Sequence, residues 1–301
     1  MKKVGYGVLG LGVGQLHIKG ALKSGECDFV AICDANEERL NQVGDQYGIL
    51  PEHRFTSYEK MLSREDIDIV SVCSPSGMHR DHSVMALKAG KHVLTEKPLE
   101  ITLERIDEMI RVANEQNRSL GCVFQNRLLP GIQKIKQTLD SSRMGKRVSS
   151  NFQVKWYRED HYYAASGGWR GTWAFDGGGV IMNQAIHTVD LMRWMMGPVK
   201  SIFAHAGTFN HDIEAEDTAV AVIKFGSGAL GTLIGTTCAY PGLDVSIQLH
   251  GVDGSIYAKN GQIELFKMRD DKAFAEEKQV IAEFGPGNPA PEVHAAQVHD
   301  M

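Results

Sequence analysis

Short apolar runs alternate with amphipathic segments through the first 125 residues of the chain. The apolar runs lie at residues 4–9, 29–33, 69–73, 93–95 and 120–124, and segments with helical spacing lie at 36–47, 79–89 and 103–117. Apolar runs of this length are typical of strands, and a repeated strand–helix alternation is typical of a parallel sheet covered by helices. Residues 1–125 are therefore predicted to form an α/β domain.

The pattern changes after residue 125. A helix-like stretch at 132–139 and a long apolar helix at 180–196 lie on either side of a run at 148–157, and strand-like runs follow at 199–209, 218–225, 229–237, 245–250 and 255–259. Consecutive strands joined by short turns are antiparallel neighbours. Residues 126–301 are therefore predicted to form an α+β domain on a largely antiparallel sheet, ending in a proline-containing loop at 285–291 and a helix-like segment at 294–301.

Composition narrows the possible partners. The 301 residues are 43% hydrophobic and 23% charged, with a formal net charge of −5 and no long block of one sign. This is a globular composition without an electrostatic footprint for nucleic acid or an anionic membrane. Five scattered cysteines, no signal peptide and no apolar stretch of membrane-spanning length favour a cytoplasmic protein with reduced thiols.

Three glycines, Gly10, Gly12 and Gly14, close the first predicted strand and open a helix. Such a turn lets main-chain N–H groups approach a pyrophosphate, and the N-terminus of the helix adds a favourable field. The spacing is G-x-G-x-G rather than G-x-G-x-x-G, so an ordinary glycine turn remains an alternative to a dinucleotide-binding turn.

Asp34 lies at the end of the second predicted strand. An acid at this offset accepts hydrogen bonds from the adenosine ribose of a dinucleotide. Because a carboxylate would repel a ribose 2′-phosphate, Asp34 favours NAD over NADP as the cofactor. The alternative is that Asp34 caps the helix that begins near Asn36.

Two further loops follow strands of the same predicted sheet. Lys97 comes after the strand at 93–95, and Ser74 and Pro75 come after the strand at 69–73. In open α/β sheets, ligands bind outside the carboxyl ends of the strands. Lys97 is therefore a candidate reactive group, and the loop at Ser74 and Pro75 is expected to lie along the cofactor.

Polar residues recur on the apolar helix predicted at 180–196. Asn183, His187, Asp190 and Trp194 follow one another at steps of four, three and four, after three glycines at 177–179. These steps place the four residues on one stripe. Either the stripe faces a polar ligand cleft, or His187 is a core histidine satisfied by Asp190 one turn away.

A glycine-containing loop at 166–173 carries flat aromatic residues. Tyr163, Trp169 and Arg170 in and before this loop suit a sugar ring, which has apolar C–H faces and polar edges. A structural loop or a subunit contact is the alternative. No zinc-type histidine spacing or Ser-His-Asp elbow occurs in the sequence, so no metal is predicted.

Taken together, these motifs resemble those of the Gfo/Idh/MocA family, the relatives of glucose-fructose oxidoreductase and inositol dehydrogenase. The tripeptide Glu96-Lys97-Pro98 and the pattern G-G-G-x-x-x-N-x-x-x-H at 177–187, in that order, are specific together. The resemblance implies an N-terminal Rossmann domain, a bound nicotinamide cofactor and a C-terminal open sheet that often forms an oligomer interface, here a homodimer or homotetramer. It also implies hydride transfer at one hydroxyl of a sugar, sugar derivative or cyclitol.

The resemblance also implies roles for single residues. Lys97 and His187 match the family's catalytic lysine and histidine, and Asn183 stands where aspartate is usual, so it would orient a hydroxyl rather than take a proton. The expected cofactor-binding residues are Gly10, Gly12, Val13, Gly14, Gln15, Asp34, Ser74, Pro75, His79, Glu96 and Lys97. The expected substrate-binding residues are Tyr163, Trp169, Arg170, Asn183 and His187. Relatives continue beyond residues 294–301 through a helix and a closing strand, which are expected to be missing here.

We expect His187 to act as general base and Lys97 to orient the hydroxyl and stabilise the developing alkoxide, although these two roles could be exchanged. Two other functions stay open. One is an NAD-retaining glycosidase or epimerase that uses transient oxidation, and the other is a non-catalytic NAD-binding sensor.

Overall fold

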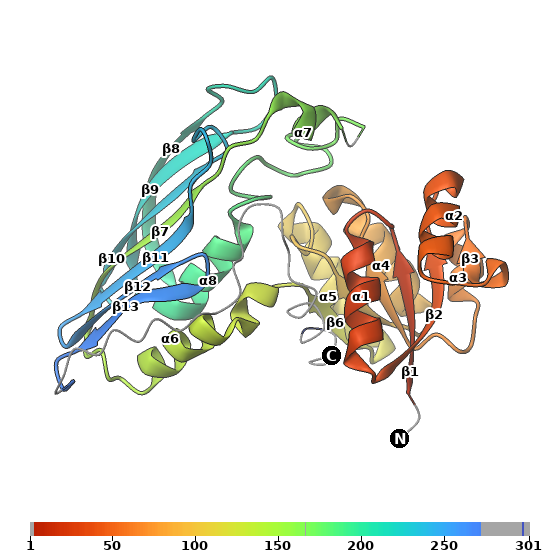
Figure 1. The fold of residues 1–301 in the computed structure, drawn as a ribbon, viewed down its shortest axis with the longest axis horizontal. Coiled ribbons are helices and arrows are strands. Elements are labelled where there is room, and N and C mark those ends of the chain that lie inside the picture. Colours follow the sequence, from red (N-terminus) through yellow and green to blue (C-terminus); the bar gives the residue numbers. More distant parts are fainter. Residues whose placement is uncertain (1–2, 166, 272–296, 298–301) are drawn as a thin grey trace. The chain divides into compact units, whose positions relative to one another are not determined.

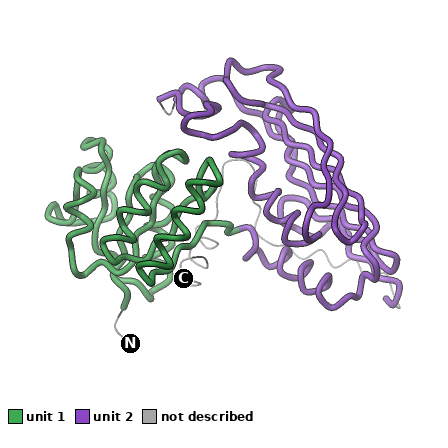
Figure 2. Tube along the Cα trace, turned by 180° about the vertical axis from the view of Figure 1, so that it is seen from behind, with its two compact units in different colours: residues 1–125, 290–301 green, residues 126–289 purple. Residues whose placement is uncertain are grey.

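The computed structural model describes residues 3–165, 167–271 and 297. The chain divides into two compact units, residues 1–125 with 290–301 and residues 126–289 (Figure 2). The loop expected at 285–291 lies outside the described residues, as does the segment expected at 294–301 apart from Gln297.

The first unit is built on a six-stranded sheet of order β3-β2-β1-β4-β5-β6, in which every strand pair is parallel (Figure 1). Its strands are β1 (Val4–Leu9), β2 (Cys27–Cys33), β3 (Arg54–Phe55), β4 (Ile69–Val72), β5 (His92–Thr95) and β6 (Leu120–Cys122). This is the strand order of a Rossmann fold, which binds dinucleotides where the order reverses, between β1 and β4.

Helices cover both faces of this sheet. They are α1 (Gly14–Ser24), α2 (Glu37–Gln46), α3 (Tyr58–Leu62), α4 (His79–Lys88) and α5 (Leu103–Gln116), with short 3-10 turns η1 (Pro51–His53) and η2 (Ser76–Met78). A third 3-10 turn, η3 (Gln125–Leu128), begins at the last residue of this stretch and continues into the second unit. The neighbours Val93 and Leu94 on β5 belong to two different buried clusters. Because side chains alternate along a strand, this separation places one apolar core on each face of the sheet.

The second unit is built on a seven-stranded sheet of order β13-β12-β11-β7-β10-β9-β8, antiparallel except for the pair β7–β10. Its strands are β7 (Arg147–Lys155), β8 (Val199–Gly207), β9 (Thr218–Phe225), β10 (Leu230–Thr236), β11 (Val245–Gly251), β12 (Gly254–Lys259) and β13 (Gln262–Met268). Its helices are α6 (Pro130–Asp140), α7 (Asp160–Ala164) and α8 (Ile186–Met196). The predicted fold class, a parallel Rossmann sheet followed by a largely antiparallel sheet, is confirmed.

Helices α6 and α8 lie along one face of this second sheet (Figure 1). On β9, Ala221 and Ile223 are buried while Val220 and Val222 between them are exposed. The period of two shows that one face of β9 packs on the core and the other does not. Among the residues that the structure describes, the second sheet is thus open on the side away from its helices.

The helix predicted at 180–196 begins only at Ile186, so its first six residues were predicted wrongly. Glu216 holds this segment in turns: its main-chain oxygen accepts from Val180 N, and its carboxylate accepts from the N–H groups of Gly179 and Ile181. A side-chain carbon on Gly179 would collide with the main-chain oxygen of Glu216. These tertiary hydrogen bonds use N–H groups that an extended helix would need.

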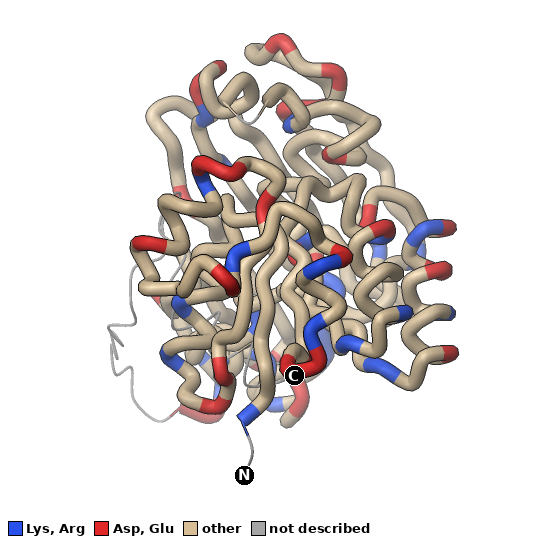
Figure 3. The backbone as a smooth tube through the Cα atoms, turned by 90° about the vertical axis from the view of Figure 1, so that its right-hand side faces the viewer, with Lys and Arg blue, Asp and Glu red and all other residues tan. Residues whose placement is uncertain are grey.

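Acidic and basic residues are interspersed along the backbone (Figure 3). Among the described residues, no helix is both long enough and apolar enough to cross a lipid bilayer.

Candidate functional site

The three glycines between β1 and α1 have three different surroundings. Gly10 has a φ of +86°, and a side-chain carbon on it would lie 2.6 Å from the main-chain oxygen of Cys73. A side-chain carbon on Gly14 would lie 2.8 Å from Cγ1 of Val8, whereas one on Gly12 would meet nothing within 4 Å. Gly10 thus permits the turn, Gly14 permits close helix–strand packing, and Gly12 leaves open space at the turn. These are the roles of the three glycines of a dinucleotide fingerprint, so the turn fits a pyrophosphate despite its shorter spacing.

Two more residues of this turn, Val13 and Gln15, are at least partly exposed. Val13 is the residue before α1 and is 41% exposed, and the Gln15 side chain donates to the main-chain oxygen of Leu11 at 3.1 Å. The N-terminus of α1, which begins at Gly14, presents a positive partial charge to an anion at this turn.

Asp34 follows β2 and is buried beside the turn. Its Oδ2 accepts from Leu11 N at 2.8 Å, and its Oδ1 accepts from Asn36 N at 2.9 Å. The residue that caps α2 is Asn36, whose side chain accepts from Arg39 N, so the interpretation of Asp34 as the cap is wrong. Arg39 Nη1 lies 3.5 Å from Asp34 Oδ2, in a side chain that is half exposed. Asp34 therefore ties the glycine turn to the start of α2 and keeps its carboxylate at the sheet edge.

Lys97 follows β5 at the same edge, next to the buried Glu96. Glu96 Oε2 accepts from Lys97 N at 3.0 Å, and Glu96 Oε1 lies 2.9 Å from Nε2 of His17, a buried residue of α1. Glu96 N donates to Val72 O at 2.9 Å, which extends the pairing of β5 with β4 up to the lysine. The start of the Lys97 loop is thus fixed from two sides.

The loop after β4 is held against the Lys97 loop by His79. This side chain is 1% exposed, and its ring nitrogens lie 2.8 Å from Pro98 O and 2.9 Å from Ser74 O. Burial lowers the pKa of His79, and the two carbonyl groups act in the opposite direction. Pro75 begins the short turn η2, whose Met78 N donates to Pro75 O. His79 therefore links two loops of the sheet edge to each other.

In the second unit, Asn183 lies in the turns before α8 and is buried. Its amide nitrogen donates to Asp176 Oδ1 at 2.8 Å, and Asp176 Oδ2 accepts from Gly171 N at 2.9 Å. The Asp176 carboxylate thus fixes the orientation of the Asn183 amide. Because Asn183 precedes the helix, its predicted place on one helix stripe with His187, Asp190 and Trp194 is wrong, whereas the other three residues do lie on α8.

His187 is the second residue of α8 and is half-buried. Asp190, one turn later, pairs with Arg127: Asp190 Oδ2 lies 2.7 Å from Arg127 Nε, and Oδ1 lies 2.5 Å from Nη2. This two-point geometry is the strongest arrangement of an arginine with a carboxylate. Asp190 is thus engaged as an ion-pair partner of Arg127.

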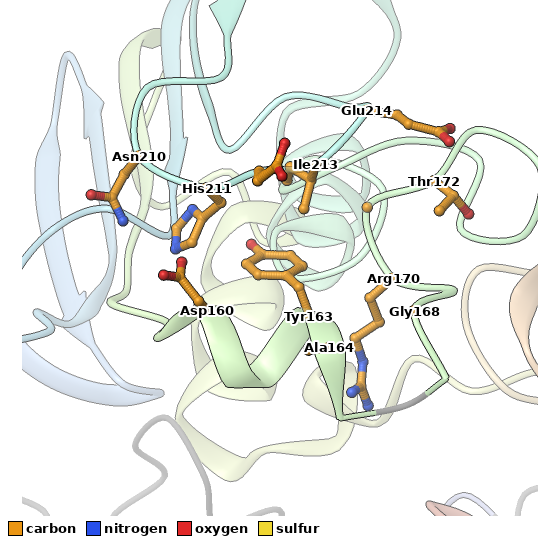
Figure 4. A pocket seen from close by; sticks show the side chains of 12 residues that line it. Asp160, Tyr163, Ala164, Gly168, Arg170, Thr172, Asn210, His211, Ile213 and Glu214 are labelled. Atoms are coloured by element: carbon orange, nitrogen blue, oxygen red, sulfur yellow. The ribbon is translucent and has the colours of Figure 1, made fainter.

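A pocket of about 620 Å³ in the second unit includes Tyr163 and Arg170 (Figure 4). The Tyr163 hydroxyl is 2.9 Å from Thr237 Oγ1, and burial raises the pKa of Tyr163 to about 12. The Arg170 guanidinium lies 4.4 Å from the ring centre of Tyr162 and 5.3 Å from that of Trp169. The volume suits a small ligand, and its carboxylates and hydroxyl groups suit polar ligand edges.

Reasoning from the sequence missed three residues that support the predicted site residues within their own units: His17 in the first unit, and Asp176 and Glu216 in the second. Each is buried or holds main-chain N–H groups through contacts with residues distant in the sequence. No local pattern marks such contacts, although a lone acid beside three glycines, as at Asp176, is a usable signal.

Family models match both parts of the chain. Residues 4–124 match the oxidoreductase family with an NAD-binding Rossmann fold, and residues 132–257 match the GFO/IDH/MocA C-terminal domain. The myo-inositol 2-dehydrogenase of Thermotoga maritima is 29% identical over 264 residues, which cover 84% of this chain and 75% of that protein.

Solved structures agree with the family models. The WlbA dehydrogenase of Bordetella pertussis, in complex with NADH and UDP-GlcNAcA, superposes with a TM-score of 0.85 at 34% identity, covering 90% of this chain and 83% of that one. A levoglucosan dehydrogenase in complex with NADH has a TM-score of 0.86 at 19% identity, covering 99% and 88%, and supports the fold alone. With both domain models matched, the glycine turn fitted to a pyrophosphate and a relative above 30% identity across the chain, this protein belongs to the Gfo/Idh/MocA family of NAD-binding oxidoreductases.

Proposed function

We propose that this protein transfers a hydride between NAD and a ring hydroxyl of a sugar, and that the sugar is a nucleotide-linked sugar acid of the UDP-GlcNAcA type. The observation that carries the proposal is the glycine turn. Gly12 in this turn faces open space, and both Gly12, after β1, and Lys97, after β5, lie at the carboxyl edge of the parallel sheet. A group bound at that turn and extended along the edge would reach the lysine.

The chain's own residues would hold the cofactor at several points. Residues 12–15 would face the pyrophosphate, Asp34 would accept from the adenosine ribose, and Ser74 and Pro75 would lie along the nicotinamide half. When bound, NAD⁺ supplies the hydride acceptor. The Asp34 carboxylate disfavours a 2′-phosphate, which supports NAD rather than NADP.

Two residues would act on the substrate hydroxyl in this proposal. His187 accepts the hydroxyl proton on a ring nitrogen, because histidine exchanges protons near neutral pH. The Lys97 ammonium donates a hydrogen bond to the same oxygen and stabilises its developing negative charge. Asn183, with its amide nitrogen on Asp176, orients the hydroxyl without taking a proton.

The substrate class is supported by the relatives. The structures at 34% and 35% identity are WlbA dehydrogenases in complex with UDP-GlcNAcA, from Bordetella pertussis and Chromobacterium violaceum, whereas the levoglucosan dehydrogenase is 19% identical. Myo-inositol is the second candidate, from the relative at 29% identity. The names of these relatives give no support to a glycosidase, an epimerase or a non-catalytic sensor.

The test is a substrate panel. The protein is mixed with NAD⁺ and UDP-GlcNAcA, myo-inositol or levoglucosan, and growth of the reduced-nicotinamide absorbance is followed. We expect the highest kcat/KM with UDP-GlcNAcA. Tight NADH binding without reduction by any of the three would contradict the proposal and favour a sensor, and product formation without net NADH would favour transient oxidation.

The proposal extends to location and assembly. All five cysteines are free, which supports a reducing, cytoplasmic location. The open face of the second sheet carries exposed apolar side chains, among them Phe203 and Val222, which are paired across β8 and β9. A contiguous apolar face of this kind supports a homodimer or homotetramer.

A further inference from the structure

A network of hydrogen-bonded, buried polar side chains lies in the first unit beneath the glycine turn. His17 Nδ1 lies 2.8 Å from Ser71 Oγ, which in turn contacts the hydroxyl of Tyr6, and His17 Nε2 lies 2.9 Å from Glu96 Oε1. Tyr6, His17 and Ser71 are at most 1% exposed and Glu96 is 6% exposed. This network joins β1, β4, α1 and the end of β5, four elements that converge where a dinucleotide fold binds its ligand.

The donors and acceptors that these groups offer give the hydrogen bonds of the network one direction. An ionised carboxylate only accepts hydrogen bonds, so His17 Nε2 donates to Glu96. A neutral imidazole then presents Nδ1 as an acceptor, which takes the hydroxyl hydrogen of Ser71, and Ser71 Oγ accepts from Tyr6. Every hydroxyl donates once along this path, and the path ends on one carboxylate.

This carboxylate is next to Lys97. Its second oxygen accepts from the main-chain N–H of Lys97, so the same group receives a bond from α1 and a bond from the lysine loop. Burying a carboxylate is costly unless it is fully hydrogen-bonded. The two hydrogen bonds offset this cost and hold the Glu96 carboxylate in one orientation.

We propose that His17 and Glu96 form a positioning pair for Lys97: His17 orients the Glu96 carboxylate, which fixes the main chain at Lys97 and places a negative charge on the residue next to the lysine. This inference rests on the proposed role of Lys97 in hydride transfer. It explains why α1 carries a buried histidine directly below the turn that would hold the pyrophosphate. The glycine turn and the lysine are thereby coupled through one imidazole.

Three other titratable groups lie near Glu96, but none of them carries a charge that would neutralise its carboxylate. Tyr6, Cys73 and His79 all lie close enough to interact with its charge. Burial raises the pKa of Tyr6 and of Cys73 and lowers that of His79, which favours the uncharged form of each. The contacts that set the position of Glu96 beside Lys97 are therefore its hydrogen bonds with His17 and with the main chain of Lys97.

A matched pair of variants tests the orienting bond. In His17→Gln, the side-chain nitrogen still reaches Glu96, whereas in His17→Asn the same amide is one methylene too short. We expect His17→Asn to lower kcat about 10- to 100-fold with the KM for NAD within about threefold, and His17→Gln to recover most of the loss. Equal kcat in His17→Asn and wild type, or equal impairment of both variants at matched thermal stability, would overturn the proposal.

A second measurement works without any turnover. Acylation of Lys97 by an amine-selective reagent at alkaline pH is followed by mass spectrometry, with the exposed Lys88 as the internal control. Removing the negative charge in Glu96→Gln should increase the fraction of free amine, so Lys97 should react about threefold faster or more while Lys88 is unchanged. An unchanged Lys97 rate would refute the charge effect. A wild-type protein inactive on every sugar, with accelerated labelling in Glu96→Gln, would refute the proposed function and leave the pair intact.

Discussion

The glycines of the turn between β1 and α1 serve different purposes, some the fold and one the binding of a ligand. Gly10 and Gly14 face protein atoms that leave no room for a side chain, whereas Gly12 faces open space. A turn needed only for the fold would not require a glycine at the open position. Gly12 is therefore the residue at which a test of cofactor binding is least confused by stability.

We predict that Gly12→Ala folds with a thermal unfolding midpoint within a few degrees of wild type but binds NADH at least about tenfold more weakly, because the new methyl group occupies the space of the pyrophosphate. Gly10→Ala is the control, and it should lose stability because of its positive φ and the contact with Cys73. Fluorescence titration of NADH and thermal melts measure both effects. Unchanged NADH affinity in Gly12→Ala would argue against a dinucleotide at this turn.

Cofactor choice is also decided at one residue. Asp34→Ser should relax discrimination against NADP, because it removes the repelling carboxylate and releases Arg39 to meet a 2′-phosphate. The comparison is kcat/KM with NAD⁺ and NADP⁺. Adding Arg39→Ala to Asp34→Ser should remove the gain with NADP⁺. If Asp34→Ser keeps the wild-type ratio, Asp34 has no part in cofactor choice.

Elements show where sequence patterns succeed and where they fail. The strands at 4–9 and 218–225 were predicted to the residue, because each has a regular apolar pattern bounded by turn residues. The two-residue strand β3 and the five-residue helix α3 were missed, since they are too short for a periodic signal. The same holds for α7, and β13 was also missed although it is seven residues long.

The start of α8 could not have been predicted from local pattern. Residues 180–185 have the composition of an apolar helix, but Glu216, more than thirty positions later, captures their N–H groups. The glycine motif and the Lys97 motif were visible in the sequence because spacing defines them. The supports of these motifs, such as His17 under Glu96, become visible only when the fold brings distant residues together.

The loop between β8 and β9 is closed by Asp217, which is fully buried. Burial alone would raise the pKa of Asp217, but hydrogen bonds from the main-chain N–H groups of Asn210, Phe209 and His211 and from the Cys238 thiol outweigh it and hold the pKa at about 2, below its usual 3.8. A lowered pKa means that this carboxylate stabilises the folded state above about pH 4 and loses that effect as the pH falls towards 2.

We therefore predict that Asp217→Asn lowers the free energy of unfolding by about 2 kcal/mol near neutral pH, and that the difference from wild type disappears as the pH falls from about 4 to about 2. Urea unfolding of both proteins across this range measures the difference. A gap between the two proteins that stays constant down to pH 2 would show that the charge of Asp217 does not contribute.

At the scale of the whole molecule, the open sheet face is the feature that a single chain leaves unexplained. Phe203 and Val222 are 67% and 55% exposed on adjacent strands. We predict that wild type sediments as a dimer or tetramer and that Phe203→Glu combined with Val222→Lys shifts it towards monomer, since burying charges at such a contact is costly. Leu103→Glu is the control: Leu103 is 74% exposed on α5, which belongs to the first unit and not to this sheet, and the substitution should leave the mass unchanged. If the wild-type protein sediments as a monomer, the proposed dimer or tetramer is wrong.

The most direct test of the central claim, that Lys97 and His187 act on one hydroxyl, is a double-mutant cycle on the rate of NAD⁺ reduction by UDP-GlcNAcA. We predict that Lys97→Ala and His187→Ala each lower kcat about 10²- to 10⁴-fold with NADH affinity largely retained, and that the double variant is much less impaired than the product of the two effects, because groups that act as a unit are not additive. Near-normal turnover in either single variant, or effects that simply multiply, would contradict the claim.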